Sequence, residues 1–110
     1  MSKFVATRNK GFAMTFDNNY TISVQWGTEN YCEKKHTTIH PTDPMEHKRW
    51  DSLSAEIAVF DNEKMIPISS DGDDVIGWLD TKDVAKVIAI VSSAGSVEEI
   101  QTKLKVEKIK

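Results

Sequence analysis

The sequence predicts a small α+β domain: an antiparallel sheet of about four strands in a meander, covered by a C-terminal amphipathic helix, with a long polar loop at residues 27–50. Three observations predict it. Apolar residues alternate in GFAMTF, YTISVQW and SAEIAVFD, as in half-buried strands. Residues 81–94 instead follow helical spacing. At 110 residues the chain has room for one core, so we expect a single domain over residues 1–110, frayed at 1–10 and 105–110.

The first two predicted strands form a hairpin. GFAMTF places Phe12, Met14 and Phe16 on one face. YTISVQW has its own apolar face, formed by Tyr20, Ile22, Val24 and Trp26. The DNN between them is a turn composition, because Asp and Asn tolerate left-handed backbone. The opposite face carries polar, uncharged side chains: Thr15, Thr21, Ser23 and Gln25. That face is either the wetted side of a sheet or the floor of a shallow site.

The remaining strands follow the long loop. SAEIAVFD places Ala55, Ile57 and Val59 on one face, DNEK turns the chain, and MIPI is a short strand. Because Pro67 has no amide hydrogen to donate, MIPI should end there or lie at an edge. The acidic loop SSDGDD begins like a calcium-binding loop, but it lacks the required bidentate glutamate, and we interpret it as a solvated turn. VIGWL then predicts a further strand.

Two helices complete the predicted domain. Asp80 is a suitable N-cap for the first helix, whose apolar residues recur at helical spacing, and Gly95 follows its end. Ser96 and Glu99 have the spacing of a capping box, which predicts a second, short helix. The first helix is expected to pack across one face of the sheet.

The charge and cysteine content exclude several classes of protein. Fourteen basic residues are outweighed by seventeen acidic ones, so general nucleic-acid binding is disfavoured. Cys32 is the only cysteine, which excludes an intramolecular disulfide scaffold and fits a reducing cytoplasm. We expect no signal peptide and no membrane segment, because every apolar run is short or interrupted by charge. The predicted location is cytoplasmic, in the host cytoplasm if a phage encodes the chain.

The loop at residues 27–50 is the clearest place to look for a site, because connections this long are usually functional or disordered. A short helical turn is predicted at DPMEHKRW, near its end. One candidate metal site lies in the loop, with the spacing C-x3-H-x3-H-x6-H: Cys32, His36, His40 and His47. The residues TTIHP have low helix propensity, so they disfavour the helix that would align these side chains. We therefore interpret the histidines as solvated, with zinc binding as the alternative.

No catalytic signature is present. The chain has no nucleophile elbow, phosphate-cradling glycine loop or H-E-x-x-H motif. Cys32 could serve as a nucleophile only beside a histidine held by a carboxylate, and three histidines with seventeen acids produce such combinations by chance. We predict a protein that is not an enzyme and uses no cofactor, with a zinc-binding or enzymatic domain as a weaker alternative.

Three segments, GFAMTFDNNYTISVQWGTENYC, SAEIAVFD and DDVIGWLDTKDVAKVIAIVSSA, resemble a family of small accessory proteins of tailed bacteriophages that has no established catalytic activity. The family pattern reads V-Q-W/F-G, N-Y-C, a later tryptophan, A-E-[IV]-A and D-D-V-x-G-[WY]. The matching positions are Val24, Gln25, Trp26, Gly27, Asn30, Tyr31, Cys32, Trp50, Ala55, Glu56, Asp73, Asp74, Val75, Gly77 and Trp78. The chain departs from the pattern at Asn19-Tyr20, where the family has Asn-Gly, and in its C-terminal extension.

The resemblance implies a binding protein, because small phage accessory proteins commonly block a host protein or sequester a nucleotide signal of antiviral defence. Direct inhibition of a host protein is the function we expect, with a nucleotide sponge as the alternative. The expected binding residues are Gln25, Asn30, Tyr31, Trp50, Asp73, Asp74 and Trp78. In the alternative, phosphates would be bound by Lys34, Lys35, Lys48 or Arg49. A homo-oligomer is a further expectation, because a small sheet has edge strands that can pair.

Overall fold

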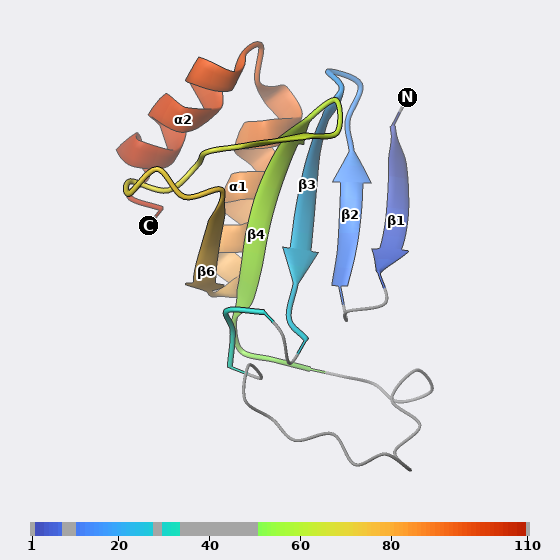
Figure 1. Ribbon diagram of the computed structural model, residues 1–110, viewed down its shortest axis with the longest axis vertical. Helices are drawn as coiled ribbons and strands as arrows, with labels where there is room; N and C mark the ends of the chain where they lie inside the picture. Colours follow the sequence, from blue (N-terminus) through green and yellow to red (C-terminus); the bar gives the residue numbers. More distant parts are fainter. Residues whose placement is uncertain (1, 8–10, 28–29, 34–50, 110) are drawn as a thin grey trace.

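A computed structural model describes residues 2–7, 11–27, 30–33 and 51–109. The described chain forms six strands and two helices (Figure 1). The strands are β1 (Lys3–Thr7), β2 (Gly11–Thr15), β3 (Tyr20–Gln25), β4 (Ala55–Asp61), β5 (Lys64–Ile66) and β6 (Val75–Leu79). The helices are α1 (Thr81–Ser93) and α2 (Val97–Val106). The predicted α+β fold is therefore confirmed, with more strands than the four expected. The predicted helical turn DPMEHKRW lies outside the described residues.

All strand pairs are antiparallel, and the first five strands are neighbours in chain order. β6 leaves this meander and returns to β4. β5 pairs with Val59–Asp61, in the second half of β4, whereas β6 pairs with Ala55–Ala58, in its first half. Two short strands thus share one edge of β4. The expectation of a simple meander is wrong at this point, because a return to β4 is a long-range pairing that strand periodicity does not encode.

The sheet has one covered face and one open face. α1 lies behind the sheet in Figure 1, where it contacts β3, β4 and β6, and α2 lies beside the sheet and contacts α1. The predicted alternation is confirmed, since Ile22, Ile57 and Val59 are fully buried under α1 whereas Ser23 and Gln25 are only half-buried on the other face. α1 does not contact β1 or β2 to a comparable extent, so the helix layer covers only part of the sheet.

Residues 3–7, which belong to the segment expected to fray, form β1, and this strand pairs along its whole length with β2. Two side-chain hydrogen bonds hold it: Ser2 Oγ donates to Asp17 Oδ1, and Thr7 Oγ1 donates to Gln25 Oε1 at 2.8 Å. The second bond crosses β2 at Gly11, where an added Cβ would lie 2.8 Å from the Gln25 amide carbon. A glycine at this position lets Gln25 reach the edge strand.

The DNN turn joins the two layers. Asn19 has a φ of 71°, as the turn composition predicts. The Asn18 amide Nδ2 donates to the carbonyl oxygens of Val91 at 2.8 Å and Ala94 at 3.0 Å, at the C-terminal end of α1. Carbonyls at a helix end lack intrahelical partners, so this side chain caps α1 from the sheet.

The helix signals are confirmed, and α2 ends at Val106, within the segment expected to fray. Asp80 accepts a hydrogen bond from the Asp83 amide at 2.9 Å, and Ser96 accepts one from the Glu99 amide at 3.1 Å. After α2 the chain turns at Lys108, whose φ is 58°, and the buried Ile109 packs against the core. That apolar contact holds the end of the tail. None of the described helices has the length and apolar character needed to cross a membrane.

Candidate functional site

Residues 30–33 fold back onto the start of β4. Asn30 is 6% exposed and uses both ends of its amide: Oδ1 accepts from the Gly27 amide at 2.9 Å, and Nδ2 donates to Glu56 Oε1 at 2.9 Å. The Tyr31 amide donates to Glu56 Oε2 at 3.4 Å. A buried side-chain amide needs such partners, because an unpaired polar group in the interior is costly. We call this arrangement the Asn30–Glu56 junction.

The same segment also binds β6, at a β-bulge. β6 is out of step with β4 between Leu79 and Ile76, where it inserts an extra residue. The Trp78 amide donates to the Tyr31 carbonyl at 2.8 Å, and Trp78 has a φ of 61°. Gly77 permits this approach, since a Cβ on it would lie 2.4 Å from the Cβ of Tyr31. Asn30, Tyr31, Glu56, Gly77 and Trp78, which come from three separate segments, therefore form one structural unit.

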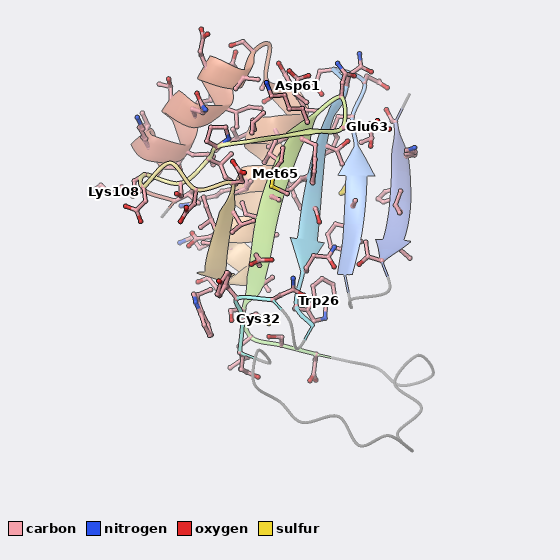
Figure 2. The ribbon with its side chains drawn as sticks, in the orientation of Figure 1. Trp26, Cys32, Asp61, Glu63, Met65 and Lys108 are labelled. Carbon is pink, nitrogen blue, oxygen red and sulfur yellow. The ribbon has the colours of Figure 1, made fainter. Side chains whose placement is uncertain are left out.

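Three large apolar side chains are exposed at this end of the domain. Tyr31 is 47% exposed, Leu53 78% and Trp78 50%. Tyr31 and Trp78 are joined by their backbone hydrogen bond, and Leu53 precedes Ser54, whose hydroxyl accepts from the Glu33 amide at 2.9 Å. We call Tyr31, Leu53 and Trp78 the aromatic end. Figure 2 shows Trp26 and Cys32 at this same end of the sheet, opposite the β4–β5 turn at Asp61 and Glu63.

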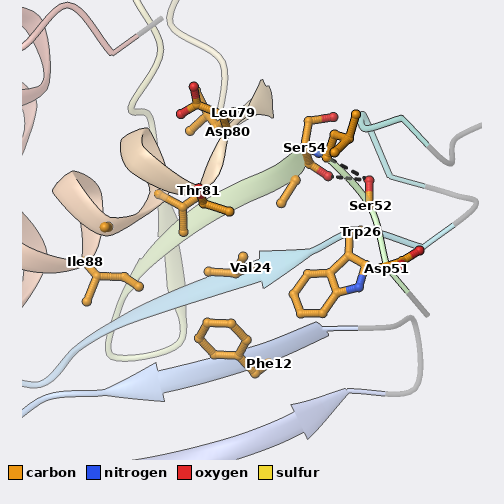
Figure 3. A pocket seen from close by; sticks show the side chains of 14 residues that line it. Phe12, Val24, Trp26, Asp51, Ser52, Ser54, Leu79, Asp80, Thr81 and Ile88 are labelled. Carbon is orange, nitrogen blue, oxygen red and sulfur yellow. Dashed lines mark hydrogen bonds between the residues drawn. The ribbon is translucent and has the colours of Figure 1, made fainter. Parts of the chain in front are cut away.

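An open cavity of about 430 Å³ lies beside the aromatic end, between α1 and the sheet (Figure 3). Its sheet wall is formed by Phe12, Val24 and Trp26, whose rings and side chain face the cavity. Phe12 and Trp26 meet edge to face with centroids 6.1 Å apart. The helix wall is formed by Val84, Ala85 and Ile88. The cavity exists because α1 covers β3 and β4 but leaves this part of β2 uncovered.

Polar residues also line the cavity. All four residues of the segment 51–54 belong to the lining, Leu53 among them. Ser52 Oγ donates to the Ser54 carbonyl at 2.7 Å, so its hydroxyl hydrogen is used within the chain (Figure 3). Asp80, which caps α1, and Asp51 are the acidic residues of this lining. Apolar walls with acidic groups among the lining residues suit an apolar group that carries positive charge next to it.

The predicted binding residues do not all gather at one surface. Gln25 accepts from Thr7 and donates Nε2 to Ser23 Oγ at 3.1 Å, so its amide holds the sheet together. Asp73 and Asp74 precede β6, about 13–17 Å of strand away from Trp78 at roughly 3.3 Å per residue. Trp78 lies with Tyr31 instead. Trp50 is outside the described residues, as are Lys34, Lys35, Lys48 and Arg49.

The candidate metal ligands are only partly described. Cys32 is fully buried and its Sγ lies 3.4 Å from the Gly27 carbonyl oxygen, the geometry of a weak thiol donor. His36, His40 and His47 lie outside the described residues. Among residues 2–7, 11–27, 30–33 and 51–109, no group of three acidic, histidine or cysteine side chains is placed to bind a metal ion. The packing of Cys32 gives it a structural role in the loop.

The sequence does not predict the cavity. Val84 and Ile88 belong to the apolar stripe of α1, and Phe12 to the alternation of β2, and both patterns are typical of core residues. The available signal was the exposed Leu53 in the segment that precedes β4, where a large apolar residue interrupts polar neighbours. No family model, curated protein or solved structure matches this chain. The resemblance to phage accessory proteins thus stays a prediction.

Proposed function

We propose that this protein is a non-enzymatic, phage-type binding protein that inhibits a host protein by direct contact. The observation that carries the proposal is the open apolar cavity beside the exposed Tyr31, Leu53 and Trp78. Tyrosine and tryptophan dominate the energetics of many protein interfaces, especially beside a pocket that receives an anchor from the partner. The aromatic end and the cavity together supply both features.

The chemistry of the cavity specifies the partner's anchor. A volume of about 430 Å³ is near the lower end for ligand sites and accommodates one large apolar side chain. Among the described lining residues there is no lysine or arginine, whereas Asp51 and Asp80 are acidic. The whole chain carries a net charge of −3. We therefore propose that the partner inserts an aromatic or aliphatic side chain flanked by basic residues.

The nucleotide alternative has less support. It relied on the amides of Gln25 and Asn30, and both amides already bond within the chain. Binding a nucleotide there would break the bond that holds β1 or the Asn30–Glu56 junction. Catalysis by Cys32 likewise has little support, because its thiol is fully buried against Gly27.

The test compares two tryptophan substitutions on one helix. Ala85 and Ala89 are both exposed on α1, one turn apart, but only Ala85 lines the cavity. Ala85→Trp should fill the cavity and Ala89→Trp should leave it open. The wild type and both variants would be immobilised and exposed to bacterial lysate, and any retained protein would be purified for titration calorimetry and activity assays.

We expect the wild type and Ala89→Trp to retain one partner stoichiometrically and inhibit it, with at least tenfold weaker binding by Ala85→Trp. Equal thermal stability of the two variants would show that the difference is local. Equal binding by all three proteins would overturn the role of the cavity. A nucleotide released on heating the purified protein, with no protein retained, would favour the sponge instead.

A further inference from the structure

β1 is an exposed edge of the sheet. Among the described residues it pairs with β2 alone, so the backbone groups along its other edge have no strand partner. Four of its five residues are exposed, including Phe4 at 79% and Val5 at 41%. An edge strand of this kind is a template for another strand. This surface is independent of the cavity proposed above to bind a host protein.

The usual protections of an edge strand are weak in β1. The sequence KFVAT contains no proline, and its pairing with β2 runs through five consecutive residues without a bulge. Lys3 is its only charged residue. The hydrogen bonds from Ser2 to Asp17 and from Thr7 to Gln25 hold both ends of the strand in place. The edge is therefore ordered before any partner arrives, which lowers the entropic cost of pairing.

We propose that β1 pairs antiparallel with β1 of a second copy of this chain, about a two-fold axis through Val5. This register aligns all five residues of the strand: Val5 faces Val5 of the other copy, Phe4 faces Ala6, and Lys3 faces Thr7. A large ring lies opposite a small side chain, and no two like charges are opposed. A two-fold axis requires such a self-complementary patch.

The pairing also continues the apolar face of the sheet, the face on which α1 covers β3 and β4. Phe4 pairs with Met14 and Ala6 with Phe12, and these partners sit in the same cross-strand rows as the core residues Ile22 and Val24. Joining two sheets at β1 would thus bury Phe4 in an extended apolar row. Two phenylalanines contribute roughly 300–500 Å², and with the strand backbones the interface falls below the 1,200 Å² or more of stable complexes. We expect a dimer that dissociates in the micromolar range.

A charge swap on the axis tests the register. Val5→Lys brings two positive charges face to face in the dimer, and Val5→Glu brings two negative charges. The control is Met65→Lys, because Met65 is an apolar strand residue that is 39% exposed on β5. By analytical ultracentrifugation the wild type and Met65→Lys should dimerise with rising concentration, each Val5 variant alone should stay monomeric, and an equimolar mixture of the two should form a heterodimer.

A disulfide provides an independent measurement. Paired residues in antiparallel strands have Cα separations of about 4.5–5.5 Å, within the range for a disulfide. Val5→Cys should therefore form a covalent dimer under mild oxidation, whereas Lys3→Cys should not, because the two copies of residue 3 lie at opposite ends of the paired strands. Cys32 is fully buried and does not compete. A wild type that stays monomeric at millimolar concentration, or equal cross-linking of both cysteine variants, would overturn the proposal.

Discussion

The Asn30 side-chain amide nitrogen donates a 2.9 Å hydrogen bond to Glu56 Oε1. This bond connects the segment after β3 to the second residue of β4. The same carboxylate accepts from the Tyr31 amide through its second oxygen. A charged acceptor strengthens both bonds. Glu56 therefore fixes the segment that presents the Tyr31 ring, and positions one residue of the aromatic end without contacting a partner itself.

Exchanging the donor and acceptor side chains of the Asn30–Glu56 junction should show that the two residues are directly hydrogen-bonded. Asn30→Asp keeps the acceptor for Gly27 but places two carboxylates together, so we expect a loss of about 1–3 kcal/mol in unfolding free energy. Glu56→Gln in the same protein supplies a donor and should restore most of that loss. Chemical denaturation of the two single variants and the double variant measures the coupling. Strictly additive losses would mean that the two side chains do not interact.

Gly77 should tolerate no side chain. A Cβ there would lie 2.4 Å from the Cβ of Tyr31 and 3.0 Å from its carbonyl oxygen, so Gly77→Ala must push the segment away from β6. We expect destabilisation of about 1–3 kcal/mol, typical of overpacking. Gly95→Ala is the matched control, because its nearest neighbour would be the Glu99 carboxylate at 3.6 Å, an ordinary contact. That variant should change stability by less than about 0.5 kcal/mol; similar losses in both would contradict the close contact.

Much of the fold could be predicted because local patterns carry it. β3 and β4 bury one face and expose the other, so their residues alternate, and α1 and α2 have side-chain caps that are visible in the sequence. β1 could not be predicted in this way. Its Phe4 lies on the apolar face of the sheet but beyond the reach of α1, so both faces of the strand are exposed and no burial pattern results.

The candidate site was less predictable, because it depends on contacts between distant segments. Asn30 and Glu56 are 26 residues apart, and Tyr31 meets Trp78 across a larger separation. In the sequence Asn30 is one polar residue in a polar loop, and only the fold reveals that its amide is buried. The cavity depends on α1 lying over β3 and β4 while it leaves part of β2 uncovered, and neither the helical stripe nor the strand alternation specifies that position.

Low pH should weaken the N-terminal cap of α2, because it protonates the Glu99 carboxylate. The hydrogen bond from Lys103 Nζ at 3.0 Å, with a second from the Gly95 amide at 3.2 Å, lowers the pKa of the Glu99 carboxyl from its ordinary value. Its contribution to stability is therefore complete above the unfolded-state pKa of about 4.3 and is lost as the pH falls through the lower, folded-state pKa.

Thermal unfolding as a function of pH checks this contribution. Glu99→Gln should lower the melting temperature slightly at neutral pH, because the side chain is at the surface, and the difference from wild type should vanish in strong acid. Glu98→Gln, on the adjacent exposed residue, is the control for removing one negative charge from the same helix turn. A Glu99→Gln difference that persists unchanged in acid would show that the carboxylate charge is not responsible.

A substitution of Trp78 should separate the effect of its ring on binding affinity from its effect on the stability of the fold. Its φ of 61° is unfavourable for a bulky residue, and asparagine adopts that backbone more readily. The Trp78 amide hydrogen bond to Tyr31 does not depend on the side chain, so Trp78→Asn should keep the bulge and leave the unfolding free energy unchanged or raised by up to about 1 kcal/mol.

The same substitution removes a half-exposed ring from the aromatic end. If the partner docks there, Trp78→Asn should weaken binding at least tenfold in titration calorimetry while the melting temperature holds or rises. Val106→Asn removes an exposed apolar side chain from α2 and should leave binding unchanged. Retained affinity in Trp78→Asn would exclude the ring from the interface, whereas loss of both affinity and stability would mean that Trp78 acts through the fold. Only a loss of affinity alone identifies the ring as a residue that the partner contacts.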